Sequence, residues 1–125
     1  MKIMIEACKY KQLEQRTKDF AHRAVKLAMA LEGTRLGNHI AGQLMRCSTS
    51  VAANYCACNL SQSRASFKSK LSIVLEESDE SLFWIEFAVE EKLISENKVK
   101  CIVEEAKQLK AIFYSSRKTV SSGKK

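Results

Sequence analysis

The sequence lacks proline entirely and has only four glycines among its 125 residues. Proline and glycine are the residues that tight β-turns require, so their scarcity argues against a β-rich fold and favours long helices. No run of β-branched residues bounded by turn signals is present, which also argues against alternating strands and helices. Because 46% of the residues are hydrophobic, one domain of this length can bury a core, and the composition predicts an all-α fold.

The chain also lacks an uncharged apolar run near the roughly 20 residues that a membrane span requires. The first ten residues carry charges at Lys2, Glu6 and Lys9 and do not contain the apolar stretch of a secretory signal. The five cysteines are odd in number and irregularly spaced, which argues against a disulfide framework. We therefore expect a cytoplasmic protein with no membrane association, whose cysteines are free thiols.

Motifs for catalysis, cofactor binding and metal binding are missing as well. The sequence has no Gly-x-Ser-x-Gly elbow, no glycine-rich phosphate loop and no Glu-x-x-His pair. Cys56 and Cys58 are two positions apart, and on a helix such side chains point about 200° apart, so they cannot share one ion. His22 and His39 lie in different segments without a matching set of carboxylates. We expect no enzyme activity, no cofactor and no metal; an active site assembled between subunits stays open as an alternative.

Hydrophobic residues recur at helical spacing in four successive segments. In the first of them, Phe20, Ala24 and Leu31 fall on one face of a helix, and Gly33 follows as the kind of residue that ends helices. Ser63 is a suitable N-cap for the third segment. Short connections make consecutive helices antiparallel, so the sequence predicts an up-down-up-down antiparallel four-helix bundle. The helices are expected at residues 10–31, from residue 35 or 38 to 59, and at 63–91 and 95–117.

One domain is therefore expected, with the bundle at residues 10–117. Residues 1–9 are expected to form an N-terminal extension, and residues 118–125 a disordered basic tail. The third helix has apolar residues outside its main stripe, among them Phe83 and Trp84. This second apolar face predicts a contact with another helix of the bundle or with another subunit.

Polar residues also line up in the second and third predicted helices. Arg46, Ser50 and Asn54 lie at i, i+4 and i+8 of the second, and Glu77 and Glu80 share a face of the third. If these helices pack antiparallel, Arg46 approaches the two acids. We favour a structural network that fixes helix register and satisfies its buried polar groups. A solvated acidic face is the alternative.

The net charge of +7 is unevenly distributed along the chain. Residues 1–33 have seven basic and four acidic side chains, which gives a charge of +3. Residues 92–125 have nine basic and three acidic side chains, which gives +6. Three basic and seven acidic side chains give −4 over residues 63–91. A basic excess favours a polyanionic partner, although it also serves solubility alone. Contacts with RNA or DNA phosphates are expected from Lys11, Arg16, Lys18, Arg23, Lys107, Lys110 and Arg117.

The order of these motifs resembles a known family. Its signature is matched by residues 43–55 (QLMRCSTSVAANY), 63–67 (SRASF) and 70–80 (KLSIVLEESDE). The sequence resembles the four-helix-bundle proteins encoded in intervening sequences of bacterial 23S rRNA genes. The resemblance implies a bundle that often assembles as a homopentamer. Related bundles are accessory proteins of diversity-generating retroelements, where they bind nucleic acid and a reverse transcriptase.

One departure from the family bears on function. Many relatives carry several arginines at the positions of residues 56–62, where this chain has none. The loss of those arginines weakens the nucleic-acid hypothesis and leaves the fold prediction unchanged. Two functions are therefore expected as alternatives: a non-enzymatic homo-oligomeric scaffold that binds RNA or DNA through a basic surface, and a protein–protein adaptor with no nucleic-acid role.

Overall fold

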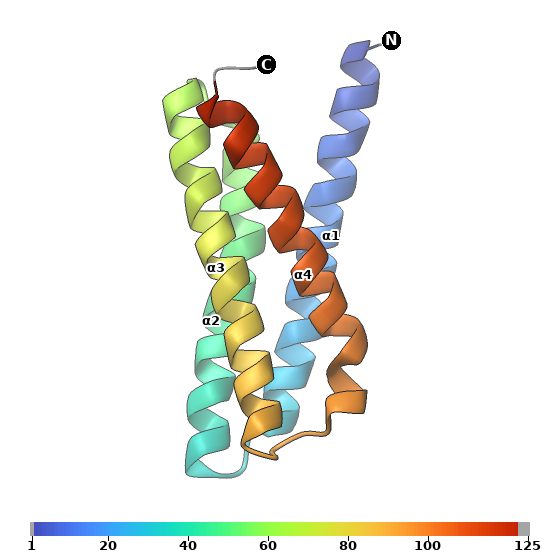
Figure 1. Cartoon of the computed structure of the whole chain (residues 1–125), viewed down its shortest axis with the longest axis vertical. Helices are drawn as coiled ribbons and strands as arrows, with labels where there is room; N and C mark the ends of the chain where they lie inside the picture. The colour runs from blue at the N-terminus through green and yellow to red at the C-terminus, as the bar shows by residue number, and fades with distance from the viewer. Residues whose placement is uncertain (1, 123–125) are drawn as a thin grey trace.

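Four helices connected by short loops make up the protein (Figure 1). The structure, a computed structural model, describes the backbone of residues 2–122 and the side chains of residues 11–122. Successive helices run in opposite directions, so the predicted all-α, up-down-up-down antiparallel bundle is confirmed. The helices are α1 (Lys2–Leu31), α2 (Arg35–Cys58), α3 (Arg64–Glu90) and α4 (Glu96–Ser121).

Side-chain caps fix where α2 and α3 begin. The Ser63 hydroxyl accepts a hydrogen bond from the backbone N–H of Ser66 at 3.0 Å, which confirms Ser63 as the N-cap of α3. The Thr34 hydroxyl accepts one in the same way from the N–H of Gly37 at 3.0 Å. Between α1 and α2 the chain turns at Gly33, whose φ of 128° is a conformation that side-chain-bearing residues rarely adopt.

Gly37 allows the end of α1 to approach the start of α2 closely. A Cβ atom at this position would lie only 2.0 Å from the carbonyl oxygen of Leu31. Since backbone atoms cannot yield as a flexible side chain can, any larger residue at Gly37 would force the two helices apart. This glycine therefore sets the geometry of the α1–α2 turn.

Two helices extend further than predicted. α1 begins at Lys2, so residues 2–9, expected as an extension outside the bundle, belong to this helix. Residues 118–121, expected in a disordered tail, form the last turn of α4. Hydrophobic periodicity fades in both segments, but neither contains a proline or glycine that would stop the backbone hydrogen-bond ladder. Residues 123–125 of the expected tail lie outside the described part of the chain.

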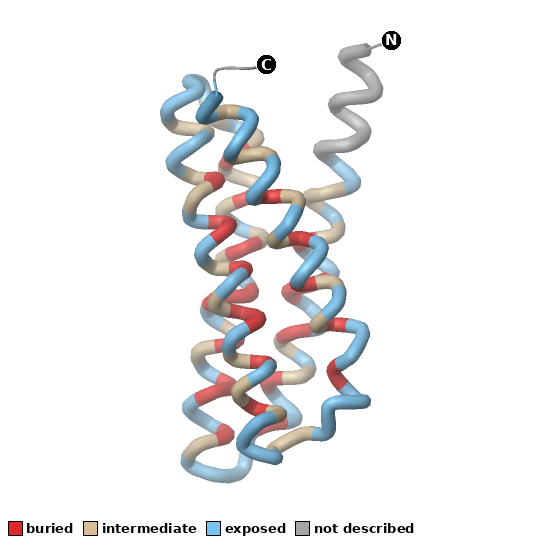
Figure 2. Tube along the Cα trace, viewed as in Figure 1, coloured by how far each residue is buried: buried red, intermediate tan, exposed pale blue. Residues whose placement is uncertain are grey.

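The helices pack in sequence around one core. α2 contacts α1 and α3, α3 also contacts α4, and the contact between α1 and α4 is the smallest of the four. α1 therefore lies diagonally opposite α3. The buried residues line the inward faces of all four helices (Figure 2), with Phe20, Leu44, Ile85 and Phe113 among the most deeply buried. None of the described helices has the length and apolarity that crossing a membrane requires.

Candidate functional site

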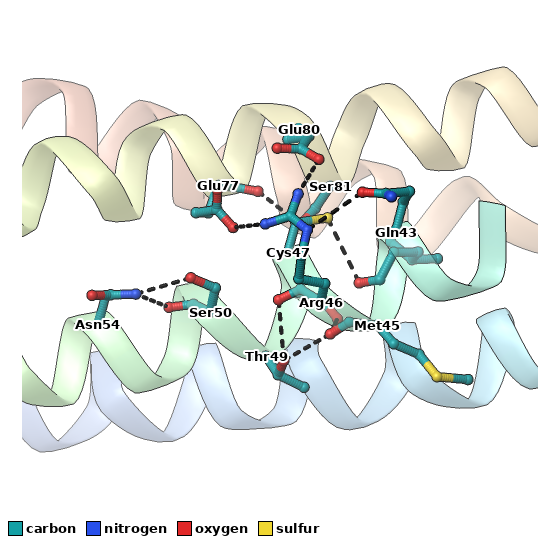
Figure 3. A network of polar contacts seen from close by, with 12 residues as sticks. Gln43, Met45, Arg46, Cys47, Thr49, Ser50, Asn54, Glu77, Glu80 and Ser81 are labelled. Carbon is teal, nitrogen blue, oxygen red and sulfur yellow. Dashed lines mark hydrogen bonds and ion pairs between the residues drawn. The ribbon is translucent and has the colours of Figure 1, made fainter. Parts of the chain in front are cut away.

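The outer edge of the α2–α3 contact holds a network of charged side chains (Figure 3). Arg46 of α2 donates a hydrogen bond from Nη1 to the Glu77 carboxylate of α3 at 3.0 Å and forms an ion pair with Glu80. Its Nε donates to the side-chain oxygen of Gln43 at 3.3 Å. The Trp84 indole N–H donates to Glu80 at 3.1 Å. The structure thus brings Arg46 together with both acids, as the antiparallel packing predicted.

The charges of this network balance one another at the surface. The Arg46 side chain is 50% exposed and that of Glu77 is 16% exposed, so the network lies at the rim of the core and not within it. The hydrogen bond from Arg46 holds the pKa of the Glu80 carboxyl below its usual value, and the Trp84 N–H acts in the same direction. The network can fix the register of α2 against α3, but it presents no unpaired group for chemistry.

Ser50 and Asn54 form a separate pair. The Asn54 amide donates to the backbone carbonyl and the hydroxyl of Ser50, both at 2.9 Å, within α2. Figure 3 shows this pair displaced along α2 from Arg46 and its acids. Because α2 and α3 are antiparallel, each turn further along α2 meets an earlier turn of α3, so Asn54 lies away from Glu77 and Glu80. The predicted five-residue network is therefore two local clusters.

Beneath this network lies the buried thiol of Cys47, and the sequence did not indicate that it contacts a residue of α3. The Ser81 hydroxyl contacts the Cys47 sulfur at 3.2 Å and donates to the carbonyl of Glu77 at 2.8 Å. Burial raises the pKa of the Cys47 thiol to about 11, so it stays protonated and is not a nucleophile near neutral pH. The i, i+4 spacing of Glu77 and Ser81 could have predicted the bond to the Glu77 carbonyl, but the contact with Cys47 depends on how α2 and α3 pack and has no local signal.

An aromatic cluster covers the outer face of α3 near its C-terminal end. Phe83 is 52% exposed, and its ring lies 4.9 Å from Trp84 and 5.7 Å from Phe87, measured between centroids. His39 of α2 contacts the Trp84 ring edge-on at 5.5 Å. Within the second apolar face predicted for this helix, Phe83 points outward, whereas Trp84 and Phe87 are partly buried against the core.

The seven basic residues predicted for phosphate contacts do not form one free surface. Arg16 binds Glu105 of α4 at 2.8 Å, and Lys110 binds Asp79 of α3 at 2.6 Å. Lys18 lines a pocket between α1 and α2. The remaining residues of the set are Lys11, Arg23 and Lys107, which are exposed, and Arg117, which is half-buried. Sequence reasoning missed the two ion pairs because each joins helices whose relative register it did not know.

Two pockets open along the groove between α3 and α4. The first, here called the basic pocket, has a volume of about 510 Å³ and is lined by Leu82, Lys107, Lys110, Ala111, Tyr114 and Ser115. The second, here called the acidic pocket, has a volume of about 420 Å³. Its charged lining residues are Glu86, Glu90, Glu96, Lys100, Glu104 and Lys107. In the part of the chain that the structure describes, no cluster of three or more histidines, cysteines or carboxylates could hold a metal ion.

Comparisons with known proteins agree on the fold and on a family. The model of the family described as 23S rRNA-intervening sequence protein matches residues 10–115. A crystal structure of a protein of unknown function from the S23 ribosomal protein family of Bacteroides thetaiotaomicron is 28% identical, with a TM-score of 0.81. The match covers 89% of this chain and 99% of that one. No curated protein matches the sequence.

Proposed function

Because the chain belongs to the 23S rRNA-intervening sequence protein family, we propose that it is a non-enzymatic scaffold that associates with itself. The observation that carries this proposal is the aromatic cluster on α3. Phe83 is 52% exposed and lies beside Trp84 and Phe87, which are only partly covered. Clustered aromatic rings open to solvent are typical of protein interfaces, where large rings become buried. A second copy of the chain is the occupant proposed here.

Charge complementarity supports a second copy as the occupant. The outer face of α1 is basic at Lys11 and Lys18 and exposes the apolar side chain of Met29, which is 59% exposed. The outer face of α3 is acidic at Glu76 and aromatic at Phe83. Pairing these two faces would join opposite charges and place a thioether against aromatic rings, which is a favourable contact.

The position of these faces determines the kind of assembly. α1 and α3 lie diagonally opposite each other, so each copy would use a different face toward each of its two neighbours. Such head-to-tail contacts build rings when the rotation between subunits closes, and filaments when it does not. The family resemblance favours a ring of five subunits. The described cysteines are free thiols, in keeping with an assembly that acts in the reducing cytoplasm.

The mass of the protein in solution tests self-association. We expect light scattering to give a ring-sized oligomer for the wild-type chain and a much smaller species for Phe83→Asp. Leu60→Asp is the matched control, because Leu60 is 81% exposed in the loop between α2 and α3 and lies outside the aromatic cluster. A wild-type monomer at micromolar concentration, or equal masses for the two variants, would refute the proposal.

Binding of nucleic acid is a second candidate function, and the placement of charge favours it. No aspartate or glutamate lies between Glu32 and Glu76, and none follows Glu105. A ring would also repeat any basic surface in every subunit, which strengthens weak binding through multivalency. We expect binding to RNA or DNA that weakens steeply as salt rises. An oligomer that does not bind nucleic acid would favour the adaptor alternative. In that case a different protein, such as a reverse transcriptase, binds to the scaffold.

A further inference from the structure

We infer that the binding site for nucleic acid is the upper half of the α3–α4 groove, and that its ligand is a single strand. The site comprises the basic pocket and the adjoining end of the bundle, where α3 begins and α4 ends. This inference rests on the nucleic-acid part of the proposed function. It places the contacts on a different face from Lys11 and Lys18 of α1.

The first observation is that α3 and α4 carry no acidic residues at this end of the molecule. α3 has no acid before Glu76, and α4 has none after Glu105. Because the two helices are antiparallel and in contact, both acid-free parts lie at the same end (Figure 1). Lys68 of α3 and Lys118 of α4 are exposed there. Beyond the basic pocket, toward this end, a phosphate backbone would meet positive charge from both helices without repulsion from a carboxylate of α3 or α4.

The second observation is the shape and lining of the basic pocket. Its volume is about 510 Å³, and Leu82 and Ala111 give it an apolar part beside two lysines. Tyr114 stands at its edge and is 54% exposed. Lys107, Tyr114 and Lys118 are separated by seven and then four positions of α4, so they lie along one face of the helix. Lysines and an exposed aromatic ring therefore alternate along one groove.

This arrangement has the chemistry of a single-strand site. Single-stranded nucleic acid binds where a basic groove follows the phosphates and aromatic rings stack on unpaired bases. Tyr114 would provide the stacking surface, while Lys107 and Lys118 would contact phosphates on either side of it. A duplex keeps its bases stacked on one another and cannot offer a free base face to the ring. The site therefore selects single strands.

The acidic pocket sets the other end of the site. Lys107 lines both pockets, and beyond it lie Glu86, Glu90 and Glu104. A phosphate backbone entering that region would meet several carboxylates. We therefore expect the strand to run from Lys107 toward the end of the bundle and not toward the α3–α4 loop.

One acid lies beside the basic pocket. Asp79 holds Lys110 at 2.6 Å, and its side chain is 62% exposed. In the absence of ligand this pair lowers the positive charge of the groove. Replacing Asp79 by asparagine leaves Lys110 free to contact a phosphate, so Asp79→Asn is expected to bind nucleic acid more tightly than the wild type.

Fluorescence anisotropy with labelled oligouridylate, oligothymidylate and duplex DNA, measured over a range of salt concentrations, tests the site. The variant Lys107→Gln/Lys118→Gln should lose affinity for both single strands. The slope of log affinity against log salt should become shallower by about 1.4, because each single-strand phosphate contact contributes about 0.7. The matched control Lys92→Gln/Lys98→Gln removes the same charge from two exposed lysines at the opposite end of the groove, beside the α3–α4 loop, and should change neither quantity appreciably.

Tyr114 separates stacking from charge. Tyr114→Ala should weaken single-strand binding about tenfold with an unchanged salt slope, and Tyr114→Phe should retain the affinity. The inference is wrong if only the Lys92→Gln/Lys98→Gln control loses binding, if duplex DNA binds as tightly as single strands, or if anionic vesicles bind in preference to RNA. If the wild-type oligomer binds none of the nucleic acids, the nucleic-acid function itself fails together with this site.

Discussion

The α2–α3 contact and the α3–α4 groove both involve α3, but charged side chains are paired at the first and mostly left accessible in the second. At the α2–α3 contact, Arg46 is bonded to two carboxylates and to Gln43, and small buried residues such as Ser81 lie beneath. Along the α3–α4 groove there are two open pockets. The one nearer the α3–α4 loop is lined mostly by acidic residues, and the other has lysines as its charged lining residues. Among the residues that the structure describes, Lys110 is the one lysine of this groove that is bound to an acid of α3.

We interpret this difference as that between a structural contact and a proposed binding surface. A network whose members satisfy one another gains little from an added ligand, because each ligand bond would replace an existing one. In the basic pocket, by contrast, the exposed Lys107 and Tyr114 keep their polar and aromatic groups available to a ligand. We therefore assign the α2–α3 network to helix register and the α3–α4 groove to ligand binding, and the following predictions test that division.

The largest expected effect is on stability, when a leucine is shortened in the closed core or beside the open groove. Leu44 of α2 is fully buried, whereas Leu82 of α3 is 8% exposed and borders the basic pocket. Leu44→Ala should lower the free energy of unfolding by about 4 kcal/mol, because it leaves a closed cavity. Leu82→Ala should cost about 2 kcal/mol, since its cavity merges with an open pocket. Urea denaturation measures both values, and equal losses would mean that the groove is packed as tightly as the core.

A smaller effect is expected from the ion pairs. Arg46→Met removes the partner of Glu77 and Glu80 together and should lower the free energy of unfolding by about 1 kcal/mol. Lys110→Met breaks a single exposed ion pair and should lower the free energy of unfolding by only about 0.3 kcal/mol. Thermal and urea unfolding of the two variants provide the comparison. A larger loss for Lys110→Met would reverse the roles assigned to the two contacts.

The pH dependence of stability tests the contribution of one carboxylate of this network, that of Glu80. Arg46 lowers the pKa of Glu80 in the folded chain. Such a group stabilises the fold above its unfolded pKa, about 4.3, and the stabilisation is lost as the pH falls through the folded value. Glu80→Gln should therefore be less stable than the wild type at pH 7, with the difference shrinking below about pH 4. A difference that is constant across this range would contradict the role given to Arg46.

The smallest effect concerns thiol chemistry and leaves stability unchanged. Burial raises the pKa of both Cys47 and Cys58 to about 11, while Cys101 on α4 is exposed. Alkylation of the native protein at pH 8 should label Cys101 first and leave the two buried thiols unmodified until the bundle unfolds. Peptide mapping by mass spectrometry reads out the order. Early labelling of Cys47 would show that the α2–α3 contact opens readily.

The bundle could be predicted from the sequence because its signals are local. Helical spacing of apolar residues, the Ser63 cap and Gly33 each depend on a few neighbouring positions, and all three agree with the structure. The approach of Arg46 to Glu77 followed from antiparallel packing alone. What failed was the end of α4, since a Ser- and Lys-rich segment can continue a helix without any hydrophobic signal.

The charge pairs of the candidate surface were harder to predict. Arg16 binds Glu105 across residues far apart in the chain, and Lys110 binds Asp79 in the same way. Such pairs depend on the rotation and vertical register of two helices, and no local pattern encodes either. The basic pocket was missed for the same reason, because Leu82 and Tyr114 meet only once α3 and α4 are docked.

The most direct test measures stability and nucleic-acid affinity in the same two variants. Arg46→Met should lose stability and keep its affinity for oligouridylate, whereas Lys107→Gln/Lys118→Gln should keep its stability and lose affinity. This crossed pattern is what a structural α2–α3 network and a ligand-binding α3–α4 groove predict. If Arg46→Met loses affinity while fully folded, or if the lysine variant binds oligouridylate as the wild type does, the division between the two contacts is wrong.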